Sequence, residues 1–94
     1  MSGFTVGFRA EAAEEFHRLR ERSQRKVAQI VEGLAANPFY PGTKALQGDL
    51  SPFRRARAGD YRVIYLADLE TKHITIVAIG LRADIYRRLS RMSL

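Results

Sequence analysis

The stretch Phe53–Ile79, FRRARAGDYRVIYLADLETKHITIVAI, decides the fold. Its apolar run Tyr61–Leu66 follows Gly59-Asp60, a dipeptide typical of a tight hairpin turn. The next run, Ile74–Ile79, is apolar on both faces, as expected for a central strand that is covered on both sides. Together with the short basic run Phe53–Ala58, these segments predict three consecutive strands joined by turns.

The part of the chain before this stretch predicts one strand and two helices. Residues 4–8 alternate apolar with small or polar residues, which predicts a short strand. A helical stripe starts at Glu11, and a clearer one places Val27, Ile30, Val31 and Leu34 on one face. Pro38 ends that second helix, and we expect the two helices to join near residues 21–23.

Residues 38–52 contain all three prolines, so we expect a loop there. A short helix from Ala83 to Leu89 ends the predicted series. The order β-α-α-β-β-β-α predicts an α+β fold in which a helical hairpin packs on a mostly antiparallel four-stranded sheet. A chain of 94 residues predicts a single domain, residues 1–94.

Composition excludes several classes of chemistry. The chain has no cysteine and only two histidines, which excludes disulfides and thiolate metal sites and argues against a zinc site. No apolar run is long enough to span a membrane and no signal peptide is evident, so we expect a cytoplasmic protein with no membrane partner. The net charge is +6, of which +5 lies in residues 51–94, so a polyanionic partner is expected.

Cations and tyrosines remain as candidates for chemistry, because the sequence shows no glycine-rich phosphate loop and no recognisable catalytic spacing of histidine, serine or acid. Arg55 and Arg57 share one face of their strand, and Arg62 interrupts an apolar run. Arg82 and Tyr86 lie one helical turn apart. These five side chains could form one concave surface that suits a phosphodiester. With RNA as substrate, the 2′-OH could be the nucleophile, and neither a metal nor a cofactor would be required.

Structural roles for the same residues stay open at this point. The arginines at 54, 55 and 57 could form a solvated edge strand, since charges there block aggregation. Arg62 could pair with Asp60 or Asp68. Tyr61 and Tyr65 share a face and fit packing better than catalysis. The arginines of the last helix could contact phosphates non-specifically or favour the negative end of that helix.

Several motifs together resemble the RelE/ParE superfamily of bacterial and archaeal toxins. Residues 44–50 (KALQGDL) resemble the Lys-Leu-x-Gly motif, residues 53–57 the Arg-x-Arg strand, and residues 59–65 (GDYRVIY) the Gly-Asp-Tyr-Arg-x-x-Tyr motif. Residues 82–87 (RADIYR) resemble the terminal Arg-x-x-x-Tyr-Arg. The resemblance covers nearly the whole chain and implies a RelE-like microbial RNase fold.

The resemblance implies a toxin of a type II toxin–antitoxin pair. RelE-like members enter the A site of the 70S ribosome and cut mRNA by attack of the 2′-OH, and an acidic antitoxin neutralises them. By the same resemblance, Arg62 and Arg82 would hold the scissile phosphate, and Tyr86 would act as base or stacking group. RNA-binding residues would be Arg54, Arg55, Arg57, Arg87 and Arg88. The basic strand lacks the lysine of many members, and arginine is a poor proton donor.

Two other functions stay open. A ParE-like toxin would poison DNA gyrase without cutting RNA, and ParE members commonly lack the full Arg/Tyr set. A catalytically inactive nucleic-acid-binding module is the third possibility. Cleavage of translated mRNA in the A site would separate the ribosome-dependent nuclease from the gyrase poison and from the inactive binding module.

Overall fold

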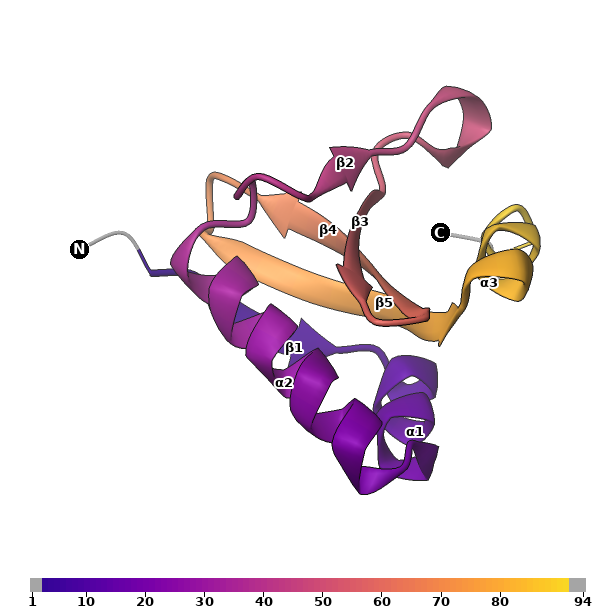
Figure 1. Ribbon diagram of the computed structural model, residues 1–94. Helices are drawn as coiled ribbons and strands as arrows, with labels where there is room; N and C mark the ends of the chain where they lie inside the picture. The colour runs from indigo at the N-terminus through magenta and orange to yellow at the C-terminus, as the bar shows by residue number, and fades with distance from the viewer. Residues whose placement is uncertain (1–2, 92–94) are drawn as a thin grey trace.

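One mixed five-stranded sheet forms the centre of the molecule (Figure 1). The computed structural model describes residues 3–91, and residues 82 and 83 by their backbone alone. The strand order is β1-β5-β4-β3-β2; β1 runs parallel to β5 and every other neighbouring pair is antiparallel. The strands are β1 (Thr5–Phe8), β2 (Lys44–Ala45), β3 (Arg54–Ala58), β4 (Tyr61–Asp68) and β5 (His73–Leu81).

The predicted α+β class is confirmed, and the strand count is five instead of four. The additional strand is β2, which lies in the segment expected to be a loop. The same segment contains a 3-10 turn, η1 (Gly48–Leu50). Because β2 has only two residues, it carries no alternation that a sequence pattern could reveal.

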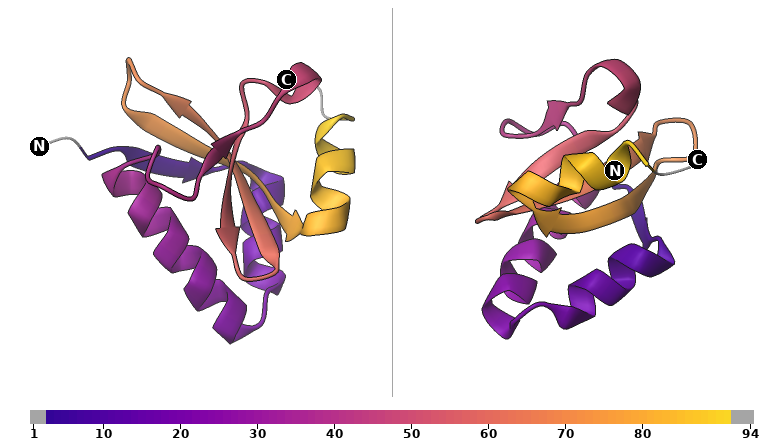
Figure 2. Two further views of the ribbon diagram at one scale, coloured as in Figure 1. Left: turned by 45° about the horizontal axis from the view of Figure 1, so that its top comes forward. Right: turned by 90° about the vertical axis from the view of Figure 1, so that its right-hand side faces the viewer.

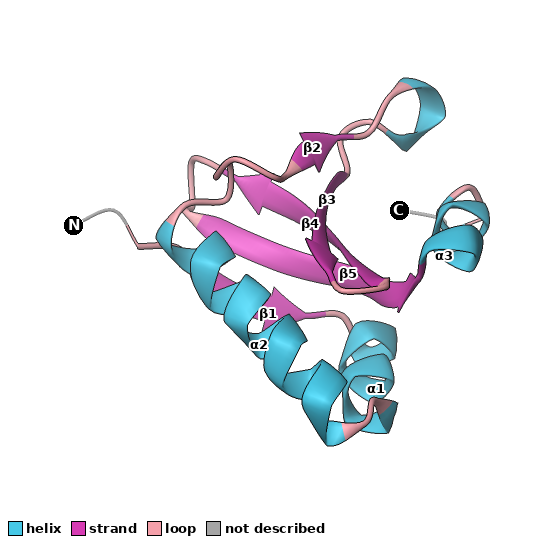
Figure 3. Cartoon of the chain, in the orientation of Figure 1, coloured by secondary structure: helices cyan, strands magenta, loops and turns pink. Residues whose placement is uncertain are grey.

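Helices cover both faces of the sheet. The helices α1 (Ala10–Arg18) and α2 (Glu21–Ala36) lie on one face, and α3 (Arg82–Leu89) lies on the other (Figures 2 and 3). The join between the first two helices is Leu19–Arg20, so the expected position at residues 21–23 was wrong. Gln24 bridges the join by donating a hydrogen bond to the carbonyl of Phe16 at 2.9 Å. None of the described helices is long and apolar enough to cross a membrane.

Each face of the sheet has its own apolar core. The core under α1 and α2 contains Tyr65, and Tyr61 packs at its margin, which confirms the packing role expected for this pair. The smaller core under α3 includes Phe53, Ile64 and Ile85. The sheet is therefore covered on both faces, although α3 covers only part of its own face.

A bulge in β5 changes which side chains face α3. Ile64 pairs with Ala78, whereas Tyr65 pairs with Ile76, so Val77 is the extra residue in β5. Val77 and Ala78 both contribute to the core under α3, which breaks the strict alternation. The bulge thereby sets which residues of β5 stand beside the basic part of β4.

Candidate functional site

A row of two arginines and a glycine crosses three strands on the α3 face. The turn between β3 and β4 has two residues, so Ala58 pairs with Tyr61 and Arg57 pairs with Arg62. Gly80 of β5 is the partner of Arg62 on its other side. Because directly paired residues share a face, Arg57 and Arg62 extend their side chains on the same side of the sheet.

Arg62 is a buried cation without a carboxylate partner in the described residues. The residue is 7% exposed, and its Nη1 donates to the carbonyls of Gly59 at 3.3 Å and Tyr61 at 3.1 Å. Neither Asp60 nor Asp68 makes an ion pair with it, so the structural pairing left open by the sequence is not present. The carbonyls are neutral, so the guanidinium has no counter-charge among the described residues. It can therefore bind an external anion.

Two more cations lie on the same face, farther from the turn. Arg55 pairs with Ile64 of β4 and with Lys44 of β2, so both cations lie on the face that carries Arg57 and Arg62. A hollow of about 280 Å³ is lined by Gly42, Thr43, Lys44, Arg55 and Arg57. Lys44 was not expected in the site, because its strand was expected to be loop.

The helix α3 begins beside this row of residues. Tyr86 is half-buried and packs against the core under α3, one helical turn after Arg82. Arg82 is the first residue of α3, and its side chain lies outside the described residues, so its expected convergence with Arg62 stays a prediction. The structure thus brings Arg55, Arg57 and Arg62 together and places Tyr86 on the helix that covers the same face.

Arg54 lies on the opposite face of the sheet. It pairs with Tyr65, and its guanidinium donates to the hydroxyls of Tyr65 at 3.3 Å and Thr43 at 3.0 Å. The guanidinium carbon also lies 4.8 Å from the centre of the Phe39 ring, a cation–π contact. These contacts give Arg54 a structural role and separate it from the other basic residues of β3.

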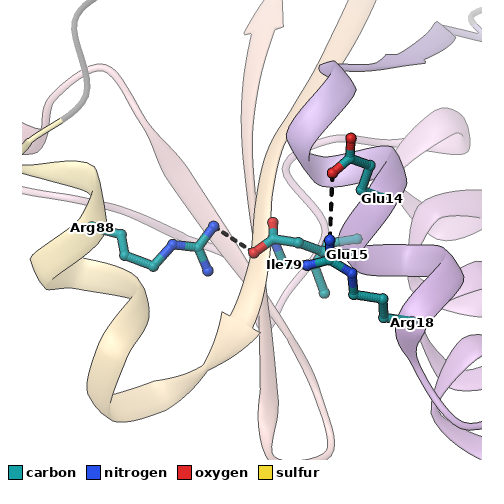
Figure 4. A network of polar contacts seen from close by, with 5 residues as sticks. All are labelled: Glu14, Glu15, Arg18, Ile79 and Arg88. Atoms are coloured by element: carbon teal, nitrogen blue, oxygen red, sulfur yellow. Dashed lines mark hydrogen bonds and ion pairs between the residues drawn. The ribbon is translucent and has the colours of Figure 1, made fainter.

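Arg88 is held by an acid on another helix. Its Nη2 lies 2.5 Å from Oε2 of Glu15 in α1, and Oε1 of Glu15 accepts the backbone N–H of Ile79 at 3.1 Å (Figure 4). Glu15 therefore fastens α3 and the edge of β5 to α1. Of the two cations expected to bind RNA from α3, Arg87 is exposed to solvent, whereas Arg88 is already ion-paired.

No group of His, Cys, Asp or Glu within residues 3–91 is arranged to hold a metal ion. The face described above offers guanidinium and ammonium groups, a phenol and backbone amides. Such groups bind and stabilise anions, above all phosphate oxygens.

Comparison with known proteins identifies the family. A family model described as the ParE toxin of type II toxin–antitoxin systems matches residues 4–86. The chain belongs to this family. It is also 36% identical over 86 residues to toxin RelG of Mycobacterium tuberculosis, covering 90% of this chain and 98% of the relative. Toxin RelE of the same organism is 36% identical over 85 residues, covering 89% of this chain and 87% of the relative.

Solved structures agree with this assignment to the RelE/ParE superfamily of toxins. The toxin–antitoxin complex RelBE2 from M. tuberculosis matches with a TM-score of 0.76 and 28% identity, covering 85% of this chain and 99% of that chain. The archaeal RelE–RelB complex from Pyrococcus horikoshii matches with a TM-score of 0.74 and 25% identity, covering 87% and 97%. The resemblance seen in the sequence is therefore confirmed for the family and for the fold of this toxin.

Two residues that form or support the candidate site could not be expected from the sequence. Lys44 enters it only through the short strand β2, and Glu15 contributes only through its contacts with α3 and β5. A helical pattern places Glu15 on a helix but does not reveal that the helix packs beside β5. Both residues depend on contacts between segments far apart in the chain.

Proposed function

We propose that this toxin is a ribosome-dependent endoribonuclease that cuts mRNA in the A site, with no metal or cofactor. One observation supports the proposal best: Arg62 is buried beside Arg57 and makes no ion pair with an acid of the described residues. The names of the relatives RelE and RelG agree with this branch of the superfamily. A cytoplasmic location follows from the ribosomal target.

The proposed reaction uses the nucleophile of the RNA itself. The 2′-OH attacks the adjacent phosphorus, the bond from phosphorus to the 5′ oxygen breaks, and a 2′,3′-cyclic phosphate forms. Arg62 and Arg82 would neutralise the charge of the pentacovalent transition state, to which guanidinium groups donate two hydrogen bonds. Tyr86 would accept the proton of the 2′-OH or stack on a base. The leaving 5′ oxygen takes a proton from water, because arginine stays charged and the basic strand β3 has no lysine.

The test is cleavage of a defined message on purified ribosomes. Primer extension would locate the cut, and the 3′ end of the upstream fragment would be analysed for the cyclic phosphate. We expect Arg62→Ala to lower the single-turnover rate by a factor on the order of 100 or more, as for loss of one preorganised charge donor. The control is Arg22→Ala, which removes an exposed cation from α2. Equal cleavage by the wild type and Arg62→Ala would exclude this role of Arg62.

A second candidate function is poisoning of DNA gyrase, because the matching family model is described as a ParE toxin. The same preparations would be incubated with gyrase and supercoiled DNA. Gyrase-dependent breaks without any cut in the message would overturn the nuclease proposal and support this alternative.

We also propose an acidic antitoxin as the partner of this toxin. Its relatives were solved as toxin–antitoxin complexes, and the +5 charge of residues 51–94 would attract an acidic chain. Growth arrest on expression should be relieved by co-expression of the small open reading frame beside the toxin gene. Persistent arrest despite soluble antitoxin would contradict this partnership.

A further inference from the structure

The cations on the α3 face form two rungs across the sheet. Lys44 pairs with Arg55 in one rung, and Arg57 pairs with Arg62 in the other. Directly opposed residues have their Cβ atoms about 5 Å apart, so both members of a rung can reach one anion. The rungs are two residues apart along β3, which is about 7 Å. An extended single strand of RNA separates its successive phosphates by a similar distance.

Protection of a sheet edge does not explain Arg55, although Lys44 itself lies on the edge strand β2. Arg54 and Arg55 are paired with β2, so β3 is not an edge strand at that point. Within residues 3–91, none of these four cations makes an ion pair with a carboxylate. Four like charges on one face without counter-charges repel one another, which is a cost that a bound polyanion removes.

The first rung also has room for a ligand. Lys44, Arg55 and Arg57 line the same hollow of about 280 Å³, together with Gly42 and Thr43. Lys44 is exposed at its rim. The hollow therefore has cations on its wall and is open to solvent, as a site for a backbone phosphate requires.

We propose that the two rungs bind two consecutive phosphates of one RNA strand. The Arg57–Arg62 rung holds the phosphate that is cut, and the Lys44–Arg55 rung holds a neighbouring phosphate. Lys44 is then an RNA-binding residue supplied by β2, outside the basic strand itself. This inference rests on the proposed nuclease function, because it takes RNA as the ligand of this face.

The first experiment measures binding without cleavage. The probe is a short single-stranded RNA with 2′-O-methyl groups, titrated against the toxin at several salt concentrations. Lys44→Met keeps most of the apolar stem and removes the charge. We expect about tenfold weaker binding, the loss of one charge-assisted hydrogen bond. The slope of log K against log salt should also fall in magnitude by about 0.7, the value for one phosphate of a single strand.

Controls separate the charge from the fold. Arg22→Met, which removes an exposed cation of α2, should leave both the affinity and the slope unchanged. If Lys44→Met folds poorly, Lys44→Gln replaces it. Lys44→Arg, which keeps the charge, should keep the wild-type slope of log K against log salt. Wild-type affinity and slope in a folded Lys44→Met or Lys44→Gln protein would overturn the inference.

The second experiment removes the phosphate instead of the lysine. Messages with one uncharged methylphosphonate, on either side of the cleaved linkage, are cut on ribosomes in single turnover. On the unmodified message, we expect Lys44→Met to cut more slowly than the wild type. On the message that lacks the charge of the phosphate bound by Lys44, the two proteins should cut at equal rates. A rate difference that persists on both modified messages would overturn the inference. Absence of all cleavage, with the binding difference intact, would refute the proposed function and leave the two-rung site standing.

Discussion

Glu15 offers a sharp test of how α3 is held against the sheet. Its carboxylate makes two contacts at once, with the guanidinium of Arg88 and with the backbone N–H of Ile79. The parallel pairing of β1 with β5 reaches only Ile76, so beyond that residue this edge of β5 has no strand neighbour. Glu15 thus provides the acceptor that a neighbouring strand would otherwise provide.

The two contacts have different energetic weights. Removing the carboxylate leaves the N–H of Ile79, a residue only 2% exposed, without its partner, which costs about 1–3 kcal/mol. The ion pair is partly exposed, 36% at Arg88 and 19% at Glu15, and contributes up to about 1 kcal/mol. We therefore expect Glu15→Ala to lower the free energy of unfolding by about 2–3 kcal/mol. For a domain of this size, that is a fall in Tm of roughly 10–20 °C.

The variants that separate the two contacts are Glu15→Gln and Arg88→Met. Glutamine keeps an acceptor oxygen for Ile79 and loses the ion pair, so we expect a loss of about 0.5–1 kcal/mol. Arg88→Met should cost a similar amount. Glu14→Ala is the matched control, because Glu14 pairs with Arg18 on the same helix at 3.6 Å with both side chains well exposed. We expect less than about 0.5 kcal/mol from it.

Urea denaturation followed by circular dichroism measures all four variants. The expected order of destabilisation is Glu15→Ala first, Glu15→Gln and Arg88→Met together, and Glu14→Ala last. The reasoning would be refuted by a Glu15→Gln protein as unstable as Glu15→Ala. That result would assign the effect to the ion pair and not to the acceptor for Ile79.

Three further predictions concern stability. A Cβ at Gly80 would lie 3.0 Å from Nη1 of Arg88 and 3.0 Å from Cδ1 of the buried Ile85, so Gly80→Ala should cost about 1–3 kcal/mol in thermal denaturation. Arg54→Ala should cost about 1–2 kcal/mol through its lost bond to Tyr65, while the salt slope of RNA binding stays unchanged; a changed slope would make Arg54 an RNA contact. Burial, with a smaller repulsion from Tyr65, raises the pKa of Tyr40 above its usual 10.0. The folded state then holds this proton more tightly than the unfolded chain, so its contribution is complete below pH 10 and is lost as the pH rises further. Tyr40→Phe should lose less stability between pH 10 and 11 than the wild type, and equal losses would contradict this origin.

Much of the fold could be predicted because hydrophobic periodicity and turn signals act locally. The two-residue turn Gly59-Asp60 fixes the register of β3 and β4, so the pairing of Arg57 with Arg62 can be counted from the sequence alone. Gly59 has a φ of +65°, which glycine adopts without strain. The join of α1 and α2 was misplaced because its cap, Arg20, makes no side-chain capping bond and carries no capping signal.

The remaining part of the site depends on contacts between distant segments. Strand alternation alone puts Arg54 and Arg55 on opposite faces, but two partners of Arg54, Thr43 and Phe39, come from the loop before β2. Lys44 joins the site because that loop runs back along β3 and adds two residues to the sheet. Neither contact leaves a periodic signal in the sequence, so only the folded chain reveals them.

The α3 face of the sheet is divided between packing and charge. At the end of β4 nearest the turn, Arg62 pairs with Arg57 on one side and with Gly80 on the other. Two residues on, Ile64 begins the apolar core that α3 covers. The helix α3, which carries Tyr86, is held to the sheet by its apolar residues in that core and by the ion pair of Arg88 with Glu15. Stability and the proposed chemistry are therefore coupled: loosening α3 should impair Tyr86 while leaving the rungs on β2, β3 and β4 able to bind phosphate.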